Sequence, residues 1–242
     1  MSELGRELLQ LVEIDIDQCT LTYGSSPCTA TLSSSNVRKC YNTFFTCQDT
    51  ANFNAGTLTL RFAHNQAGLP KGQTVFPALR SVSTNAASIN LGGVDRRKGP
   101  LGKRARVQVQ LQDFAYHDTY TDPYASGRRD GTAQNDEGGY DPETRGTFFG
   151  KLRRRFPYYI GRALRVKEGT VGQDVASMRT RHYVISEWVG PDAQGRVTIT
   201  AKDVLDLADN DKALCPTPNE GCLLYTSPSP RDRTRSRMPS SA

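Results

Sequence analysis

Residues 104–114 read RARVQVQLQDF, and this stretch gives the clearest indication of the fold. Apolar side chains stand at every second position, and arginine or glutamine stands between them. Successive side chains of a β-strand point to opposite faces, so the alternation predicts a strand with one buried face and one solvent-facing face.

Shorter patterns on both sides of this stretch predict further strands. The predicted strands are residues 12–16, 57–63, 104–114, 163–166, 182–188 and 196–201, with a weaker strand pair or loop at 79–91. The polar turn GPDAQG at 190–195 predicts that the last two strands form a hairpin. Many short strands joined by turns predict a mainly β chain, with one or two small barrels or sandwiches.

Helical signals are fewer. We expect one or two turns of helix at 147–155, ending before Pro157, because the residue before a proline disfavours helix. We also expect a helical turn at 8–11 and a short helix or turn at 203–208. The long polar stretch 118–144 predicts a loop.

The composition narrows the class of protein. The chain has 242 residues and a net charge of +6, and Leu223 to Ala242 alone carry four Arg and one Asp, so charge does not by itself indicate a nucleic-acid binder. We expect no membrane span, because no run of about 18 apolar residues occurs. The N-terminus lacks the pattern of a secretory signal, so we expect synthesis in the cytosol.

The C-terminal end differs from the rest. From Cys222 onward, CLLYTSPSPRDRTRSRMPSSA has no hydrophobic period and resembles translated sequencing-adapter read-through. A disordered basic tail is the other interpretation. We therefore expect three regions: a four-cysteine module at 1–62, a β-barrel region at 63–214, and at 215–242 a truncated end followed by an artefactual tail.

Four of the six cysteines fall in one turn-rich stretch, CTLTYGSSPCTATLSSSNVRKCYNTFFTC. They are Cys19, Cys28, Cys40 and Cys47. A stretch with so few large apolar residues cannot build its own core, so a covalent or metallic link must hold it together.

The spacing alone leaves three kinds of link open. Two disulfides suit a secreted protein, but no signal peptide is present. A structural zinc site normally includes a closer pair of ligands than these cysteines offer. An iron–sulfur cluster also takes four thiolates, although these spacings match no common ferredoxin pattern.

The cysteine segments CTLTYGSSPC (19–28) and CYNTFFTC (40–47), followed by Asn52-Phe53, resemble the cysteine cluster of the lambda-type tail tip protein L family over residues 15–62. The resemblance implies a [4Fe–4S] cluster held by the four thiolates, with zinc as the alternative. It departs from the family in position, because that cluster lies at the C-terminal end of the protein and here it lies near the N-terminus.

Residues 100–214 are similar, more loosely, to tail and baseplate proteins of phages and gene transfer agents, through GTFFGKLRRRFPYYIGRALRV and RHYVISEWVGPDAQGRVTITAKDVLDLAD. Together the resemblances imply a structural protein of the virion tail, not an enzyme. They imply a homotrimer made in the host cytoplasm, joining tail tube, distal tail, tape-measure and tip proteins. A basic nucleic-acid binder and a disulfide-held surface adhesin are the alternatives from other classes.

Other chemical candidates are weaker. The histidines His64, His117 and His182 are scattered, and we interpret the acidic residues around His117 as a surface loop. Residues 130–137 offer oxygen ligands without the spacing of an EF-hand. The basic run 151–155, followed by aromatic residues, indicates a face that docks a neighbouring subunit, a solvated turn or a single-strand binder. Trp188 is expected in the core.

Overall fold

A computed structural model describes residues 7–30, 39–65, 72–89, 102–130 and 141–204. Residues 1–203 form one compact unit, which contains every helix and strand described below, and 204–242 form a second unit, of which only Val204 is described. The elements are β1 (Leu8–Cys19), η1 (Phe44–Thr46), η2 (Thr50–Asn52), β2 (Ala55–Ala63), β3 (Leu79–Asn85), β4 (Ser88–Ile89), β5 (Gly102–Lys103), β6 (Arg106–Gln112), α1 (Ala125–Asp130), α2 (Phe148–Arg155), β7 (Ala163–Thr170), η4 (Val175–Ser177), β8 (Arg179–Val189) and β9 (Arg196–Asp203).

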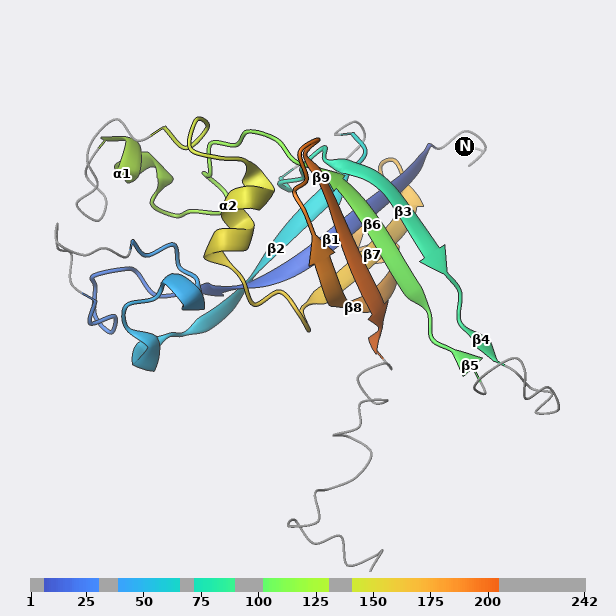
Figure 1. Ribbon diagram of the computed structural model, residues 1–242, viewed down its shortest axis with the longest axis horizontal. Coiled ribbons are helices and arrows are strands. Elements are labelled where there is room, and N and C mark those ends of the chain that lie inside the picture. Colours follow the sequence, from blue (N-terminus) through green and yellow to red (C-terminus); the bar gives the residue numbers. More distant parts are fainter. Residues whose placement is uncertain (1–6, 31–38, 66–71, 90–101, 131–140, 205–242) are drawn as a thin grey trace, which may run out of the picture. The chain divides into compact units, whose positions relative to one another are not determined.

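The first unit is built on a seven-stranded sheet with the order β2-β1-β7-β8-β9-β6-β3 (Figure 1). Neighbouring strands in this order pair antiparallel. The short strands β4 and β5 form a separate pair that continues the direction of β3 and β6. The prediction of a mainly β chain is confirmed.

The alternation of apolar and polar residues in 104–114 appears directly as burial. In β6 the three apolar side chains are buried, and the polar side chains between them face outward. The same alternation in β9 buries Val197, Ile199 and Ala201. One-sided burial of this kind gives the strands their register, because a slip by one residue would expose every core side chain.

The two edges of the sheet approach one another at one end. Phe62 of β2 forms a parallel bridge with Phe76, three residues before β3 begins. The backbone N–H of Phe76 donates to the carbonyl of Arg61, and the N–H of Ala63 donates to the carbonyl of Phe76. The strand order is therefore open, but β2 is tied to the segment that leads into β3, as in a partly closed barrel.

Two hydrophobic clusters cover the faces of β1. Val12, Ile14 and Ile16 join the main core, in which Phe62, Phe148 and Phe149 lie in edge-to-face or tilted contact. Leu9 and Leu11, on the opposite face, pack with the smaller cluster of Ala63, Val75, Val175 and Met178. Helix α2 supplies three apolar side chains to the main core, which confirms the predicted helix at 147–155.

The predicted hairpin at 182–201 is confirmed and is longer than expected, since β8 begins at Arg179. Its turn depends on Gly190, whose φ of +99° is one that side-chain-bearing residues rarely adopt. A Cβ atom at this position would lie 2.4 Å from the carbonyl oxygen of Arg196. Trp188 is buried beside this turn, as expected.

Three predictions need correction or extension. The helical turn expected at 8–11 is wrong, because these residues belong to β1 and pair with β7 from Leu8 onward. The loop expected at 118–144 contains helix α1. Strand β7 extends to Thr170, beyond the predicted end at 166.

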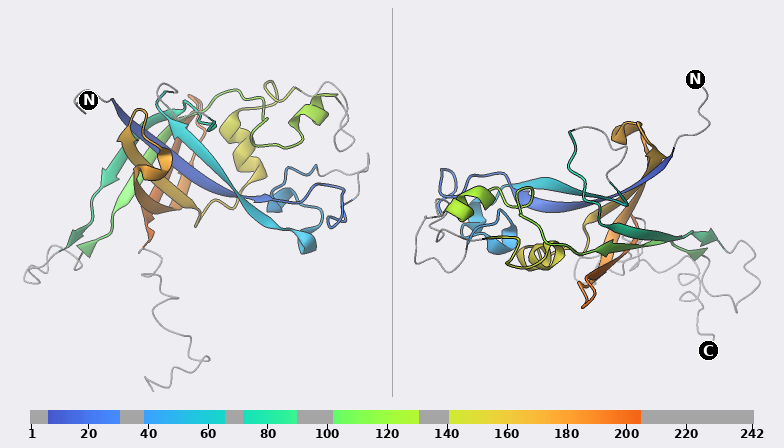
Figure 2. Two further views of the ribbon diagram at one scale, coloured as in Figure 1. Left: turned by 180° about the vertical axis from the view of Figure 1, so that it is seen from behind. Right: turned by 90° about the horizontal axis from the view of Figure 1, so that it is seen from above.

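The cysteine segment shares strands with the sheet. Strand β1 leads into it and β2 leads out of it, and β2 runs through residue 62, where we predicted a domain boundary (Figure 2). The expected tail at 215–242 lies outside the described residues, as do 90–91 of the weak strand pair and 205–208 of the short helix. No helix among the described residues is long and apolar enough to cross a membrane.

Candidate metal centre

The four predicted cysteines lie in the connection between β1 and β2. Cys19 is the last residue of β1 and pairs with Ala55, the first residue of β2. Only two short 3-10 helices, η1 and η2, occur between these strands in the described part of the connection. The strand pair therefore fixes both ends of a segment that has little regular structure of its own.

The structure brings the four thiols to one cavity. Its lining includes Cys19, Cys28, Cys40 and Cys47, together with Leu21, Tyr23, Ala30, Asn42, Thr43 and Gln48. All four cysteines are free thiols. Cys40 is buried and the other three are partly buried. The two-disulfide interpretation of this segment is thus not the state that the structure describes.

The environment of the thiols reflects this proximity. Burial raises the pKa of the Cys40 thiol to about 11, a backbone hydrogen bond from Asn42 opposes this, and the other three cysteines raise the pKa further. Burial also raises the pKa of Cys47, against a backbone hydrogen bond from Asp49. Each of these thiols therefore accepts an N–H from the residue two positions later in the chain.

The chemistry of the four thiols suits a metal centre, but their arrangement in this structure does not. Four cysteine sulfurs are a suitable ligand set for zinc or for an iron–sulfur cluster. Among the described residues, however, no group of three or more His, Cys, Asp or Glu side chains is arranged so that it could hold a metal ion. Binding through all four sulfurs therefore requires an arrangement of the four thiols that differs from the one in this structure.

Asp49 ties two arms of the cysteine segment together. Its carboxylate accepts hydrogen bonds from the backbone N–H and hydroxyl of Thr29, at 2.7 and 2.8 Å, and from the side-chain amide of Asn52 at 3.0 Å. These hydrogen bonds lower the pKa of Asp49 to about 2. Thr29 follows Cys28 and Asp49 lies two residues after Cys47, so this carboxylate holds two of the thiol-bearing turns side by side.

A buried arginine holds the third turn. Arg128 of α1, whose side chain is 1% exposed, donates to the backbone carbonyl of Cys40 and forms an ion pair with Asp122. Its guanidinium carbon also lies 4.3 Å from the centre of the Tyr41 ring, a cation–π contact. Sequence reasoning missed Arg128, because its partner Cys40 is far away in the chain and α1 itself was not predicted.

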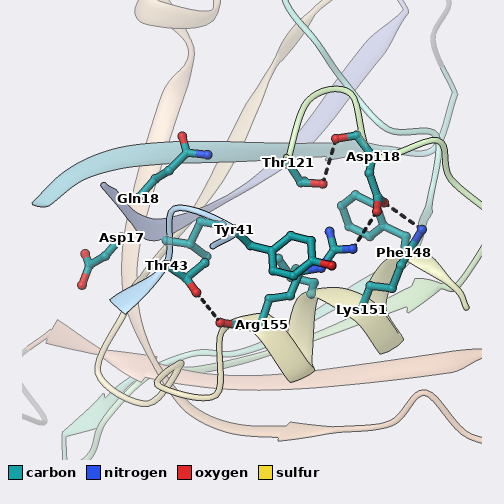
Figure 3. A pocket seen from close by; sticks show the side chains of 11 residues that line it. Asp17, Gln18, Tyr41, Thr43, Asp118, Thr121, Phe148, Lys151 and Arg155 are labelled. Carbon is teal, nitrogen blue, oxygen red and sulfur yellow. Dashed lines mark hydrogen bonds and ion pairs between the residues drawn. The ribbon is translucent and has the colours of Figure 1, made fainter. Parts of the chain in front are cut away.

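A second ionic cluster, formed by Asp118, Lys151 and Arg155, also contacts Tyr41 (Figure 3). Asp118 accepts from Lys151 and Arg155 of α2, both at 2.8 Å, and the Arg155 guanidinium carbon lies 4.0 Å from the Tyr41 ring centre. The hydroxyl of Thr43 donates to the carbonyl of Arg155 at 2.7 Å. Residues 41–43 are thereby attached to α2.

The ion pairs of Asp122 and Asp118 correct two interpretations of the sequence. Asp118 and Asp122 are buried and paired with cations, so the acidic residues near His117 are not a solvated surface loop. Lys151 is buried and Arg155 points toward Asp118, so the basic run at 151–155 is not a continuous outward-facing surface.

The other candidates do not form a site. His117 is partly exposed and shares a hydrogen bond of 2.7 Å with the hydroxyl of Thr119. None of the three histidines lines the cysteine cavity. Most of the calcium-like stretch at 130–137 lies outside the described residues.

Comparison of the chain with protein-family models and with curated protein sequences finds no match in either. The geometry of the cysteine segment is therefore the main basis for a functional proposal.

Proposed function

We propose that this protein is a structural component of a phage tail tip or baseplate hub, and that its cysteine segment is stapled by a [4Fe–4S] cluster or, alternatively, by zinc. The observation that carries the proposal is the placement of four free thiols around one cavity at the end of the β1–β2 pair. The resemblance to the lambda-type tail tip protein L family supplies the cluster type and the setting.

The physical role of the centre is to stabilise a segment that lacks a core. Of its described residues only Tyr23, Cys40, Asn42 and Thr43 are buried, and three of these are polar or thiol-bearing. Bonds from a structural metal to four thiolates contribute on the order of 10 kcal/mol to folding. Such a centre holds the loop in place; it has no catalytic task, and the protein acts by assembly and not as an enzyme.

The sheet suits a subunit of an assembly. Its partly closed arrangement limits the length of free strand edge, which restricts uncontrolled edge pairing. We propose a homotrimer between tail tube and tip, in contact with tube, distal tail, tape-measure and tip proteins, and located in the virion tail after synthesis in the host cytoplasm.

Metal and sulfide analysis of the full chain, purified without oxygen, tests the cluster. We expect about four iron atoms and four sulfides per chain with broad visible absorption, as the [4Fe–4S] formula requires. The variant Cys40→Ser is expected to lose them, whereas the matched controls Cys215→Ser and Cys222→Ser keep them. Colourless protein with about one zinc per chain would replace iron by zinc; protein free of both would contradict the centre.

The proposed trimer and its location in a phage tail have a separate test. Sedimentation of the purified chain is expected to give the mass of a trimer, and the genes beside its own are expected to encode a tail tube and a tape-measure protein. A monomer among unrelated genes would contradict the tail proposal while leaving the metal result intact.

A further inference from the structure

Asn42 links two of the four cysteines through all of its polar groups. Its backbone N–H donates to Cys40 Sγ at 3.3 Å, and its backbone carbonyl accepts from the N–H of Cys19 at 2.6 Å. Its side-chain amide donates to the carbonyl of Cys19 at 3.2 Å, and its side-chain oxygen lies 3.5 Å from Cys40 Sγ. One side chain thus spans the end of β1 and the buried thiol.

The backbone of Asn42 is itself specialised. Its φ is 55°, in the left-handed region that few residues other than glycine and asparagine tolerate. Glycine would permit this conformation but would lose the amide that reaches Cys19. Asparagine tolerates the left-handed φ and also provides the amide. The residue is buried, with 7% of its surface exposed.

A neighbouring tyrosine, Tyr124, also contacts Asn42. The side chain of Tyr124 forms a hydrogen bond with Asn42, and the Tyr124 hydroxyl also accepts from the backbone N–H of Tyr23 at 2.9 Å. Tyr23 lines the same cavity as the thiols. The position of Asn42 is therefore determined by contacts that do not depend on any ligand.

We propose that Asn42 is a positioning residue of the four-thiol centre, which holds the turn of Cys40 against Cys19 at the end of β1 and so keeps both cysteines at the cavity in which a metal ion or cluster would bind. This inference rests on the proposed function, because it assigns a role toward the same centre. Groups that orient ligands are often as important as the ligands, and their removal typically lowers metal affinity about 10–100-fold. The N–H that Asn42 directs at Cys40 also stabilises a bound thiolate.

Titration of the full chain with Co²⁺ alone, under reducing conditions, tests the role. Tetrahedral thiolate binding gives Co²⁺ intense sulfur-to-metal and d–d bands, and zinc competition then gives the affinity. We expect Asn42→Gly, which keeps the left-handed backbone, to bind roughly 10–100-fold more weakly with altered d–d bands. Asn42→Ala is expected to be weaker still, because it also strains φ.

Asn85→Ala, at an exposed position of β3, is the matched control and is expected to bind as the wild type does. Circular dichroism of the metal-free variants confirms that Asn42→Gly retains the sheet. Wild-type affinity and unchanged bands in Asn42→Gly would overturn the positioning role. A wild-type chain that binds neither Co²⁺ nor zinc, and that carries no iron and sulfide after purification without oxygen, would instead overturn the proposed centre, and with it this inference.

Discussion

Arg128 Nε lies 2.8 Å from Asp122 Oδ2, and each of the two side chains is only 1% exposed. The same guanidinium reaches the carbonyl of Cys40, so a buried ion pair six residues apart in the chain anchors a turn of the cysteine segment. Breaking such a pair from one side strands the remaining charge in the interior.

Replacement of Arg128 by methionine is therefore expected to lower the free energy of unfolding by about 3–5 kcal/mol, because Asp122 is left buried without its cation. Urea unfolding followed by the fluorescence of Trp188, the single tryptophan, measures this change. Arg129→Met removes an exposed neighbouring cation and is expected to change the value by less than about 0.5 kcal/mol. Equal effects of the two substitutions would contradict the anchoring role.

Asp118 is the shared acceptor of Lys151 and Arg155, so Asp118→Asn leaves two largely buried cations without a counter-charge. We expect a loss on the order of 3 kcal/mol in the free energy of unfolding. Glu187→Gln, at an exposed position of β8, removes the same charge and is the matched control. If both variants unfold at the same urea concentration, Asp118 does not organise α2.

The free energy of unfolding is expected to fall at low pH because the carboxylate of Asp15 becomes protonated. Burial acts to raise the pKa of Asp15, but hydrogen bonds from Arg165, at 2.6 Å, and Thr59, at 2.8 Å, outweigh it and lower the pKa below its usual 3.8. The folded state therefore gains stability above pH 3.8 and loses it as the pH falls through the lowered value.

The variant Asp15→Asn lacks this contribution. Urea unfolding between pH 7 and pH 2 is expected to show a gap between wild type and variant that is constant near neutrality and narrows below about pH 4. A gap that stays constant over the whole range would show that the carboxylate of Asp15 titrates normally.

Two glycines with positive φ allow the cost of backbone strain to be distinguished from the cost of steric crowding at the Cβ position. Gly161 has a φ of +81° and open space around its Cβ position, whereas Gly190 combines a φ of +99° with a Cβ position 2.4 Å from Arg196 O. Gly161→Ala is expected to cost about 1–2 kcal/mol from the backbone alone, and Gly190→Ala clearly more. Thermal unfolding of both variants checks the order, and the reverse order would contradict the geometry of the hairpin turn.

The sequence predicted the strands whose two faces differ in polarity. In β6 and β9 the apolar side chains alternate with polar ones, and this local pattern survives folding because only one face is buried. At Leu8–Leu11 the apolar run suits a helix or a strand equally, and pairing with the distant strand β7 decides between them. The cysteines were recognisable because thiol clustering is itself a local signal.

The residues that hold the cysteine segment were not recognisable. Arg128 and Lys151 have the local signature of solvated cations, and their burial depends on Asp122 and Asp118, whose side chains sequence reasoning placed at the surface. Asn42 carries no signal apart from a type of residue that is common in turns. Contacts of this kind arise only when the β1–β2 connection meets α1 and α2.

Mass spectrometry of thiol protection shows whether Cys19, Cys28, Cys40 and Cys47 share one centre. The full chain, loaded with iron and sulfide or with zinc, is alkylated under native conditions, and the modified cysteines are then identified. We expect joint protection of Cys19, Cys28, Cys40 and Cys47, lost together on chelation, while the labelling of Cys215 and Cys222 does not change on chelation. Protection of only two of the four, or their recovery as disulfide-linked peptides after purification under reducing conditions, would contradict it.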